Sequence, residues 1–362
     1  MRVDALSAVH SIPADDVAEV AALLLDHYDR TARRLPWRAP PGANATDPYQ
    51  VWLSEIMLQQ TTVAAVIPYF AKFTSLWPTV HDLAQADDAD VMAAWAGLGY
   101  YARARNLIAC ARVVSHQHGG VFPDTEEGLR ALPGVGAYTA AAIAAIAFGR
   151  RAVVVDANVE RVVSRLFAID TPLPSGRAEI REATESITPL LRSGDFAQAM
   201  MDLGSSLCSA RNPSCLPCPL RPSCRASAKG NAATYPVKAP KTAKPLRQGS
   251  AWWIEYEANV WLVRRPDKGM LGGMRALPGS DWGPGAAPAL PFEGSWHWAA
   301  TPVRHVFTHF ALDLHVARIM VSRDPEGLGE EGQWWPIDRL EDAGLPTLFA
   351  RAAKAARECV RG

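Results

Sequence analysis

Four of the six cysteines lie in one short segment with the spacing Cys208-x6-Cys215-x2-Cys218-x5-Cys224. Four thiolates so close along the chain can bind a four-iron cluster or a tetrahedral zinc ion. Zinc ribbons usually bring together two separated Cys-x2-Cys pairs, whereas here one pair is flanked by single cysteines in a proline-rich loop. The spacing therefore favours a [4Fe–4S] cluster over zinc, and in either case a metal with a structural role.

Two carboxyl groups stand out by their neighbours in the sequence. Glu55 lies in an apolar stretch, with Trp52 before it and residues 56–58 after it. Apolar surroundings raise the pKa of a carboxyl group, so Glu55 could hold a proton near neutral pH and act as a general acid. Asp156 precedes a segment with apolar residues at helical spacing, which is an ordinary position for a helix N-cap. We expect it to serve as a cap and as an ionised functional group at once.

Two further features could contact phosphate. The turn at residues 132–136 (LPGVG) holds Gly134 and Gly136 directly before an expected helix, so its N–H groups and the helix N-terminus can face one anion. A turn of this kind is common in proteins and is weak evidence alone. The stretch 203–250 holds eight Lys or Arg and no Asp or Glu, although the net charge of the chain is zero. It is a candidate phosphate-binding surface, and a solvated basic linker would show the same composition.

The elements that must position these residues are mostly helices. Asp47-Pro48 predicts a helix start, and residues 139–148 predict a helix that is apolar on all sides and ends at Gly149. A third helix is expected to start near Asp156. Beyond a Pro- and Lys-rich linker the pattern changes to period two, as at residues 310–316, which indicates strands.

Several strings resemble those of MutY-type adenine DNA glycosylases, which are related to endonuclease III. They are 35–38 (LPWR), 52–61 (WLSEIMLQQT), 97–107 (GLGYYARARNL), the turn at 132–136 with 153–161 (VVVDANVER), and the cysteine spacing. The resemblance covers residues 35–225, more than half of the chain. It implies a mostly α helix-hairpin-helix glycosylase region at 1–229, in which a six-helix core with a helix-hairpin-helix is joined by N- and C-terminal helices and a [4Fe–4S] loop at 208–224. A linker at 230–249 and a smaller α+β Nudix-like domain at 250–362 are expected to follow.

The resemblance also assigns roles. Glu55 would protonate N7 of adenine and so make it a neutral leaving group, while Asp156 would stabilise or capture the sugar oxocarbenium ion. Asn158 would help to orient that site. Arg38 and Asp202 would contact the flipped adenine. Gln60 and Tyr100 would enter the gap that it leaves in the duplex. The turn with Gly134 and Gly136 would bind the DNA phosphates.

One position bears on the type of reaction. Bifunctional relatives of the endonuclease III kind carry a lysine two residues after the second glycine of the hairpin, where this chain has Tyr138. Without an amine there, no Schiff base to the sugar can form by that route. We therefore expect a monofunctional enzyme that removes the base without efficient strand cleavage.

Residues from about 249 onward resemble the C-terminal domain of the same family, on 269–274 (GMLGGM) and 304–310 (RHVFTHF). A working Nudix hydrolase needs a helix with clustered glutamates for magnesium, and Glu330-Glu331 lack the partners for one. The domain is expected to read the base opposite the adenine. The family uses a Phe-Ser-His loop for this, which here is Phe307, Thr308 and His309.

The expected partner is double-stranded DNA in which adenine lies opposite 8-oxoguanine or guanine. We expect a cytoplasmic, nucleoid-associated monomer, because no signal peptide or membrane-spanning run is evident. Three other functions remain open. A mismatch thymine glycosylase of the same superfamily is one, a non-catalytic iron–sulfur DNA-binding protein is the second, and a nucleotide pyrophosphohydrolase is the third. The presence of both Glu55 and Asp156 counts against mere binding.

Overall fold

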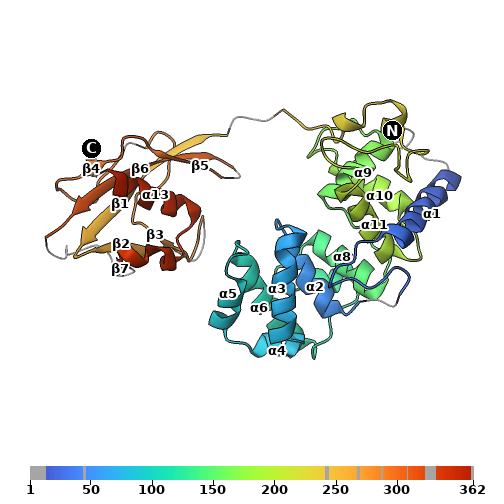
Figure 1. Cartoon of the computed structure of the whole chain (residues 1–362), viewed down its shortest axis with the longest axis horizontal. Helices are drawn as coiled ribbons and strands as arrows, with labels where there is room; N and C mark the ends of the chain where they lie inside the picture. The colour runs from blue at the N-terminus through green and yellow to red at the C-terminus, as the bar shows by residue number, and fades with distance from the viewer. Residues whose placement is uncertain are drawn as a thin grey trace, which may run out of the picture. The chain divides into compact units, whose positions relative to one another are not determined.

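A computed structural model describes residues 14–43, 46–240, 244–266, 270–286, 288–307, 309–322 and 332–359. The chain divides into two compact units, Met1–Ala239 and Pro240–Gly362. The first is helical and the second is built on a β-sheet, as the sequence predicted (Figure 1).

The helices of the first unit follow one another with short connections. They are α1 (Ala14–Thr31), α2 (Pro48–Leu58), α3 (Val63–Leu76), α4 (Val80–Gln85), α5 (Asp88–Trp95), α6 (Ala102–Gln117), α7 (Glu126–Arg130), α8 (Ala137–Phe148), α9 (Ala157–Phe167), α10 (Arg177–Ile187), α11 (Ser193–Ser205), α12 (Arg225–Ala228) and the 3-10 helix η1 (Ala232–Thr234).

The predicted local signals lie where these helices begin and end. Asp47 accepts a hydrogen bond from the backbone N–H of Tyr49 and caps α2. Helix α8 ends at Gly149, which has a left-handed φ of 62° that a glycine adopts without strain. Asp156 caps α9. The three helix predictions are confirmed.

The helices form two hydrophobic cores. One core is made by α2 to α8, and the alanines and isoleucines of α8 are buried in it. The other is made by α1, α9, α10 and α11, so that the first helix packs against the last ones of the unit (Figure 1). Residues facing the junction of these two cores come from segments far apart in the sequence.

Helices α7 and α8 pack against each other as a hairpin around the Gly134–Gly136 turn. Gly134 has a φ of 74°, and a Cβ at this position would lie 2.7 Å from Cβ of Asn106. Both the backbone angle and the close approach require glycine here. Gly136 is the N-cap residue of α8, so the helix N-terminus faces outward at an exposed turn.

The second unit is a mixed sheet backed by one long helix. Its elements are β1 (Leu246–Tyr256), β2 (Asn259–Arg264), β3 (Arg275–Ala276), β4 (His297–Trp298), β5 (Val303–Val306), β6 (Ala311–Met320), β7 (Gly332–Pro336), the 3-10 helix η2 (Ile337–Ala343) and α13 (Thr347–Glu358). The strand order is β3-β2-β1-β6-β4, with β7 on β2 and β5 on β6. The central pair β1 and β6 is parallel, with Leu246 opposite Ala311. Strand β1 thus begins inside the segment that the sequence assigned to a linker, because residues 246–249 hydrogen-bond to β6.

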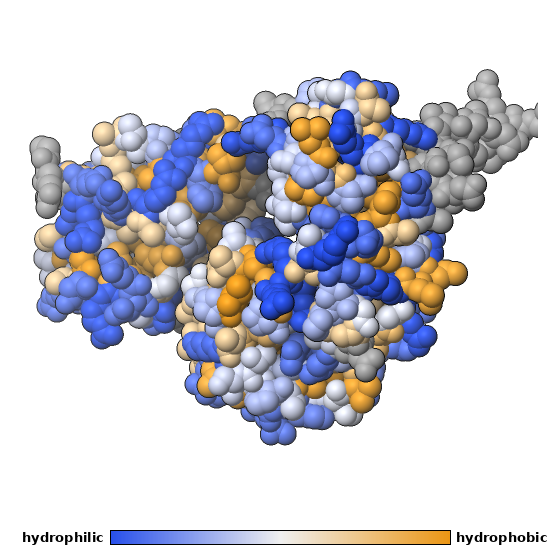
Figure 2. Space-filling model, turned by 45° about the vertical axis from the view of Figure 1, so that its right-hand side comes forward, coloured by the Kyte–Doolittle hydropathy of each residue, from blue (hydrophilic) through white to orange (hydrophobic). Residues whose placement is uncertain are grey.

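None of the described helices is long and apolar enough to cross a membrane. On the face drawn in Figure 2, apolar side chains are scattered among hydrophilic ones.

Candidate active site

A cavity of about 940 Å³ opens between the two helical cores of the first unit. Six of the residues singled out in the sequence line it: Arg38, Glu55, Gln60, Tyr138, Asp156 and Asn158. They come from the segment after α1, from α2 and the turn after it, and from the starts of α8 and α9. The fold therefore brings together side chains that are up to 120 positions apart in the chain.

Glu55 is the buried acid of this cavity, with 7% of its surface exposed. Burial raises its pKa to about 7, and the negative charge of Asp156 adds to this effect. The hydroxyl of Tyr138 and the guanidinium of Arg38 act in the opposite direction and only partly offset it. A carboxyl group with this pKa is half protonated at neutral pH, as a general acid requires.

The carboxyl group of Asp156 accepts hydrogen bonds from three donors. Its Oδ1 accepts from the backbone N–H groups of Asn158 and Val159 at 2.9 and 2.7 Å, and its Oδ2 accepts from Nδ2 of Asn158 at 2.8 Å. Two of these donors are backbone N–H groups at the N-terminus of α9. The two carboxyl groups of the cavity therefore have opposite environments, one apolar and one rich in donors.

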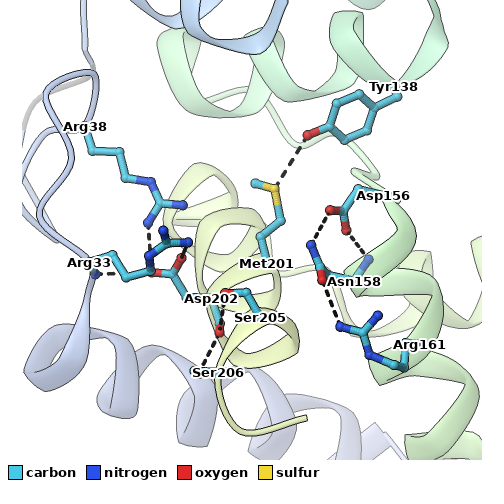
Figure 3. Close-up of polar contacts among 10 residues, drawn as sticks. All are labelled: Arg33, Arg38, Tyr138, Asp156, Asn158, Arg161, Met201, Asp202, Ser205 and Ser206. Atoms are coloured by element: carbon cyan, nitrogen blue, oxygen red, sulfur yellow. Dashed lines mark hydrogen bonds and ion pairs between the residues drawn. The ribbon is translucent and has the colours of Figure 1, made fainter. Parts of the chain in front are cut away.

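Asn158 is itself fixed by Arg161. Nη2 of Arg161 donates to Oδ1 of Asn158 at 2.8 Å (Figure 3). Nε of Arg161 donates to the carbonyl of Cys208 at 2.8 Å. A continuous chain of hydrogen bonds thus runs from Asp156 to the first cysteine of the cysteine loop. The sequence analysis did not single out Arg161, although it lies five residues after Asp156, on the same helix.

Tyr138 lies at the start of α8 with its hydroxyl in the cavity. The hydroxyl donates to Sδ of Met201 on α11 at 3.6 Å (Figure 3). Burial and the neighbouring Glu55 raise the pKa of Tyr138 well above its ordinary value, so the phenol stays neutral. It can donate a hydrogen bond here but cannot form an imine.

Asp202 lies beside the cavity rather than along its lining. Its Oδ2 pairs with Nη1 of Arg38 at 2.8 Å and accepts from the backbone N–H of Arg33 at 3.2 Å (Figure 3). Asp202 is 8% exposed, so this is a buried ion pair that orients Arg38. The family resemblance predicts that Arg38 and Asp202 both contact the adenine. In the structure they also form an ion pair with each other.

Other lining residues carry polar groups that sequence reasoning missed. Gln198 on α11 is 6% exposed and lines the cavity together with Arg33 and Trp37. Trp37 adjoins Arg38 in the LPWR string, so proximity to that motif was an available signal. Gln198 lies in an apolar stretch of α11, where a single polar residue gives no indication of a site.

The residues expected at the duplex lie on exposed turns. Gln60 follows α2 and Tyr100 precedes α6, and the side chain of Tyr100 is 62% exposed although it is a large aromatic. Gly134 and Gly136 lie on the hairpin described above. Of these four residues only Gln60 lines the cavity.

The four clustered cysteines surround a small apolar pocket. Cys208, Cys215, Cys218 and Cys224 line it with leucine and valine side chains of α9, α11 and the loop itself. Arg165, which is 1% exposed, places Nη1 3.2 Å from Sγ of Cys208 and binds the carbonyls of Ser209 and Ala210. None of the six cysteines forms a disulfide.

In the second unit, Phe307 is half-buried among other rings. It stacks on Trp282 with a centroid distance of 5.7 Å and contacts His305 and Phe310. Its carbonyl accepts a hydrogen bond from Lys244 at 2.5 Å. His309 is exposed, and Thr308 lies outside the described residues, as do Gly269 and Glu330-Glu331.

Comparison with known proteins agrees with this geometry. Residues 53–189 match the model of the HhH-GPD superfamily of base excision DNA repair proteins, and residues 250–355 match the NUDIX domain. An adenine DNA glycosylase of Homo sapiens is 37% identical over 88% of this chain and 69% of its own length. One of Mycobacterium tuberculosis is 42% identical over 54% of this chain and 64% of its own length.

A solved structure of a thermostable thymine-DNA glycosylase is also similar. It has a TM-score of 0.53 and 29% identity, and the match covers 59% of this chain and 98% of that one. With the two matched domains and the paired carboxyl groups of the cavity, these likenesses identify the chain as a member of the adenine DNA glycosylase family.

Proposed function

We propose that this protein hydrolyses the N-glycosidic bond of adenine mispaired with 8-oxoguanine or guanine, as a glycosylase of base excision repair. The observation that carries the proposal is the pair of carboxyl groups in one cavity. Burial raises the pKa of Glu55 to about 7, while the carboxyl group of Asp156 accepts three hydrogen bonds. Excision of a poor leaving group needs one acid and one base of this kind.

In this mechanism Glu55 donates its proton to N7 of adenine, and the bond from N9 to the sugar breaks with its electron pair moving to the base. The sugar becomes an oxocarbenium ion, which the carboxylate of Asp156 stabilises or captures until water adds. Asn158 keeps that carboxylate oriented, and Arg38, held by Asp202, supplies a donor to the adenine. Because the target base must leave the duplex, Gln60 and Tyr100 fill the gap.

The test is an excision assay on four duplexes with adenine opposite 8-oxoguanine, guanine, cytosine or thymine, and a fifth with thymine opposite guanine. Adenine release from the first two duplexes alone supports the proposal. Thymine release without adenine release would favour a mismatch thymine glycosylase, and tight binding without release would favour a non-catalytic DNA-binding protein.

Strand cleavage is expected to be inefficient. Tyr138 occupies the position where a lyase needs an amine, and its phenol cannot form the Schiff base through which β-elimination proceeds. Borohydride added during the reaction should trap little covalent complex. The control is Tyr138→Phe, which lacks an amine as well and should trap no more than the wild type. Strong trapping by both proteins would contradict this prediction and indicate an amine elsewhere in the chain.

We also propose a [4Fe–4S] cluster on Cys208, Cys215, Cys218 and Cys224. Among the described residues, no three His, Cys, Asp or Glu side chains converge on a point that could hold one metal ion. A zinc site needs such convergence, whereas in a cubane each cysteine binds its own iron around a larger body. All four cysteines line one apolar pocket, which supports a cluster bound by the four of them, and the cluster would stabilise the loop.

Purified protein should accordingly contain about four irons per chain and be yellow-brown. Cys218→Ser should lose iron and visible absorption, while Cys359→Ser, outside the loop, should keep both. Stoichiometric zinc without iron in protein prepared without air would refute the assignment.

The second unit is proposed to read the base opposite adenine through Phe307, Thr308 and His309. Packing of Phe307 against Trp282 and Phe310 fixes the start of this segment, and His309 is exposed beside it. We propose that catalysis belongs to the helical unit, Met1–Ala239, and recognition of the opposite base to the sheet unit, Pro240–Gly362.

Replacing Thr308 and His309 together by alanine should reduce the preference for 8-oxoguanine over guanine by about 1–3 kcal/mol, or roughly 5- to 150-fold. The reason is that a hydroxyl and an imidazole can contact the N7–H and O8 that distinguish the two bases. Single-turnover rates on both duplexes measure it, with His297→Ala, also exposed in this unit, as control. If the preference is unchanged, the second unit does not read the opposite base and only clamps duplex DNA.

A further inference from the structure

Gln60 and Tyr100 share an unusual backbone conformation. Their φ angles are 56° and 51°, in the left-handed region that few residues other than glycine adopt. For a bulky residue such as Tyr100 this conformation costs on the order of 1 kcal/mol and persists only where surrounding contacts enforce it. Two exposed turns, after α2 and before α6, are thus held in defined shapes.

One side chain contacts both turns. Arg103, on the first turn of α6, directs Nη1 at the carbonyls of Ile56 and Met57, at 3.0 and 2.8 Å. These carbonyls belong to the last turn of α2, where helix bonds are missing and a cation is favoured. The same guanidinium therefore completes the end of the helix from which the Gln60 turn departs.

Its other terminal nitrogen reaches both turns. Nη2 of Arg103 donates to Oγ1 of Thr61 at 3.1 Å and to the carbonyls of Leu98 and Gly99 at 3.2 and 3.4 Å. Thr61 directly follows Gln60, and Gly99 directly precedes Tyr100. The two left-handed residues are each one position away from an atom that Arg103 binds.

Aromatic rings complete the environment of the guanidinium. Its central carbon lies 5.3 Å from the ring centre of Trp95 and 5.5 Å from that of Tyr100, distances at which a cation is attracted to a ring. Trp95 is fully buried and donates its own N–H to the carbonyl of Gly99 at 3.0 Å. The guanidinium of Arg103 thus lies close to both a buried ring of the core and the exposed ring of Tyr100.

We propose that Arg103 is a positioning residue that fixes the spacing of the Gln60 and Tyr100 turns, so that both side chains enter the duplex together as adenine leaves it. The inference rests on the proposed roles of Gln60 and Tyr100. Arginine suits the task because its planar fork binds several carbonyls in one plane and stacks on a ring. A lysine ammonium could keep the charge but could not reach both turns at once.

The alternative is that Arg103 only supports the fold. The two roles differ in one respect: a positioning residue acts through Gln60 and Tyr100, so its loss should matter little once they are gone. Interaction of this kind appears as non-additivity in a double-mutant cycle, whereas independent effects add.

The experiment compares Arg103→Gln in the wild-type background and in one carrying Gln60→Ala with Tyr100→Ala. We expect single-turnover excision from the adenine–8-oxoguanine duplex to fall by about 10-fold or more in the first background and by less than about 2-fold in the second. Equal losses in both backgrounds would overturn the proposal. Arg112→Gln is the control, because it removes another α6 arginine that binds a carbonyl and an aspartate but neither turn.

A second readout does not depend on excision. In proteins that all carry Glu55→Gln, a duplex with 2-aminopurine in place of the adenine reports extrusion as a rise in fluorescence. Arg103→Gln should reduce that rise at saturating protein, and Arg103→Lys should recover it only in part. An undiminished rise would overturn the proposal. If thermal unfolding shows that Arg103→Gln is not folded, both measurements are made on Arg103→Lys instead.

The outcomes separate this inference from the proposed function. If the wild type releases no adenine, the proposed function fails, and extrusion can still be measured. If the wild type releases adenine while the losses at Arg103 add to those at Gln60 and Tyr100, only the positioning role fails.

Discussion

Replacing Glu55 by glutamine is expected to slow adenine excision by about 10²–10⁴-fold, the range that general acid catalysis supplies. The amide keeps the size of the side chain and lines the same cavity, but it has no proton to give to N7 of adenine. Binding of the mismatch should stay near normal. Single-turnover excision and a binding titration on the same duplex measure the two effects separately.

The pH dependence follows from the raised pKa of Glu55. Only the protonated form can donate, so excision by the wild type should fall about tenfold per pH unit above a pH of about 7. Glu55→Gln, with its acid gone, should lose this limb of the pH profile. The matched control is Glu160→Gln, which changes an acid that lines the same cavity but pairs with Arg177 at 2.9 Å.

Glu55→Gln should also stabilise the fold, and the linkage between ionisation and folding sets the sign of this change in stability. The folded pKa of about 7 lies above the ordinary 4.5, so the folded protein loses stability as the pH rises from 4.5 through 7 and the buried group ionises. The cost reaches about 3 kcal/mol above pH 7 and vanishes below pH 4.5. Glu55→Gln should therefore unfold at a higher temperature than the wild type at pH 8, and the gain should shrink toward pH 4.5. Near-normal excision by Glu55→Gln, or no rise in its unfolding temperature at pH 8, would contradict the assignment of Glu55 as the buried general acid.

Asp156→Asn is expected to slow excision on the order of 10³-fold while leaving the fold intact. Asparagine caps a helix about as well as aspartate, so α9 should keep its N-cap and the free energy of unfolding should change by less than about 0.5 kcal/mol. What disappears is the negative charge that would face the oxocarbenium ion. Thermal unfolding and single-turnover excision together separate the cap from the chemistry.

A second aspartate offers the control for this result. Asp87 caps α5 and accepts a hydrogen bond from Ala89, but it does not line the cavity. Asp87→Asn should leave both stability and excision close to those of the wild type. If Asp156→Asn behaved in the same way, Asp156 would be a helix cap alone.

The local structure of the helical unit could be predicted from short segments of sequence. Asp47-Pro48 and Asp156 mark helix starts, and Gly149 marks a helix end, because each acts on backbone groups within four residues of itself. The apolar neighbours of Glu55 likewise predicted a raised pKa, since most of the burial comes from its own helix and the core that the helix enters. The absence of a lysine at Tyr138 is also visible in the sequence alone.

The strand boundaries were harder to predict. Residues 246–249 belong to β1 because they pair with β6, some 65 positions later. A parallel partner so distant leaves no local signal, and the lysines and prolines nearby favoured a linker. The stacking of Phe307 on Trp282 has the same origin, because these two rings are 25 positions apart in the chain.

By itself, then, the sequence identified the residues proposed to carry the chemistry: Glu55, Asp156 and the four clustered thiols. Immediate neighbours singled out Glu55 and the thiols, whereas the family resemblance supplied the role of Asp156. Only the tertiary structure decided how they meet. The cavity lies between two hydrophobic cores, so it was the packing of α2 and α8 near α9 and α11 that brought Glu55 within electrostatic reach of Asp156 and added Gln198 to the lining. The same packing pairs Asp202 with Arg38, a contact that the sequence did not predict. Such contacts join residues more than a hundred positions apart, and their geometry depends on how helices pack rather than on any pattern along the chain.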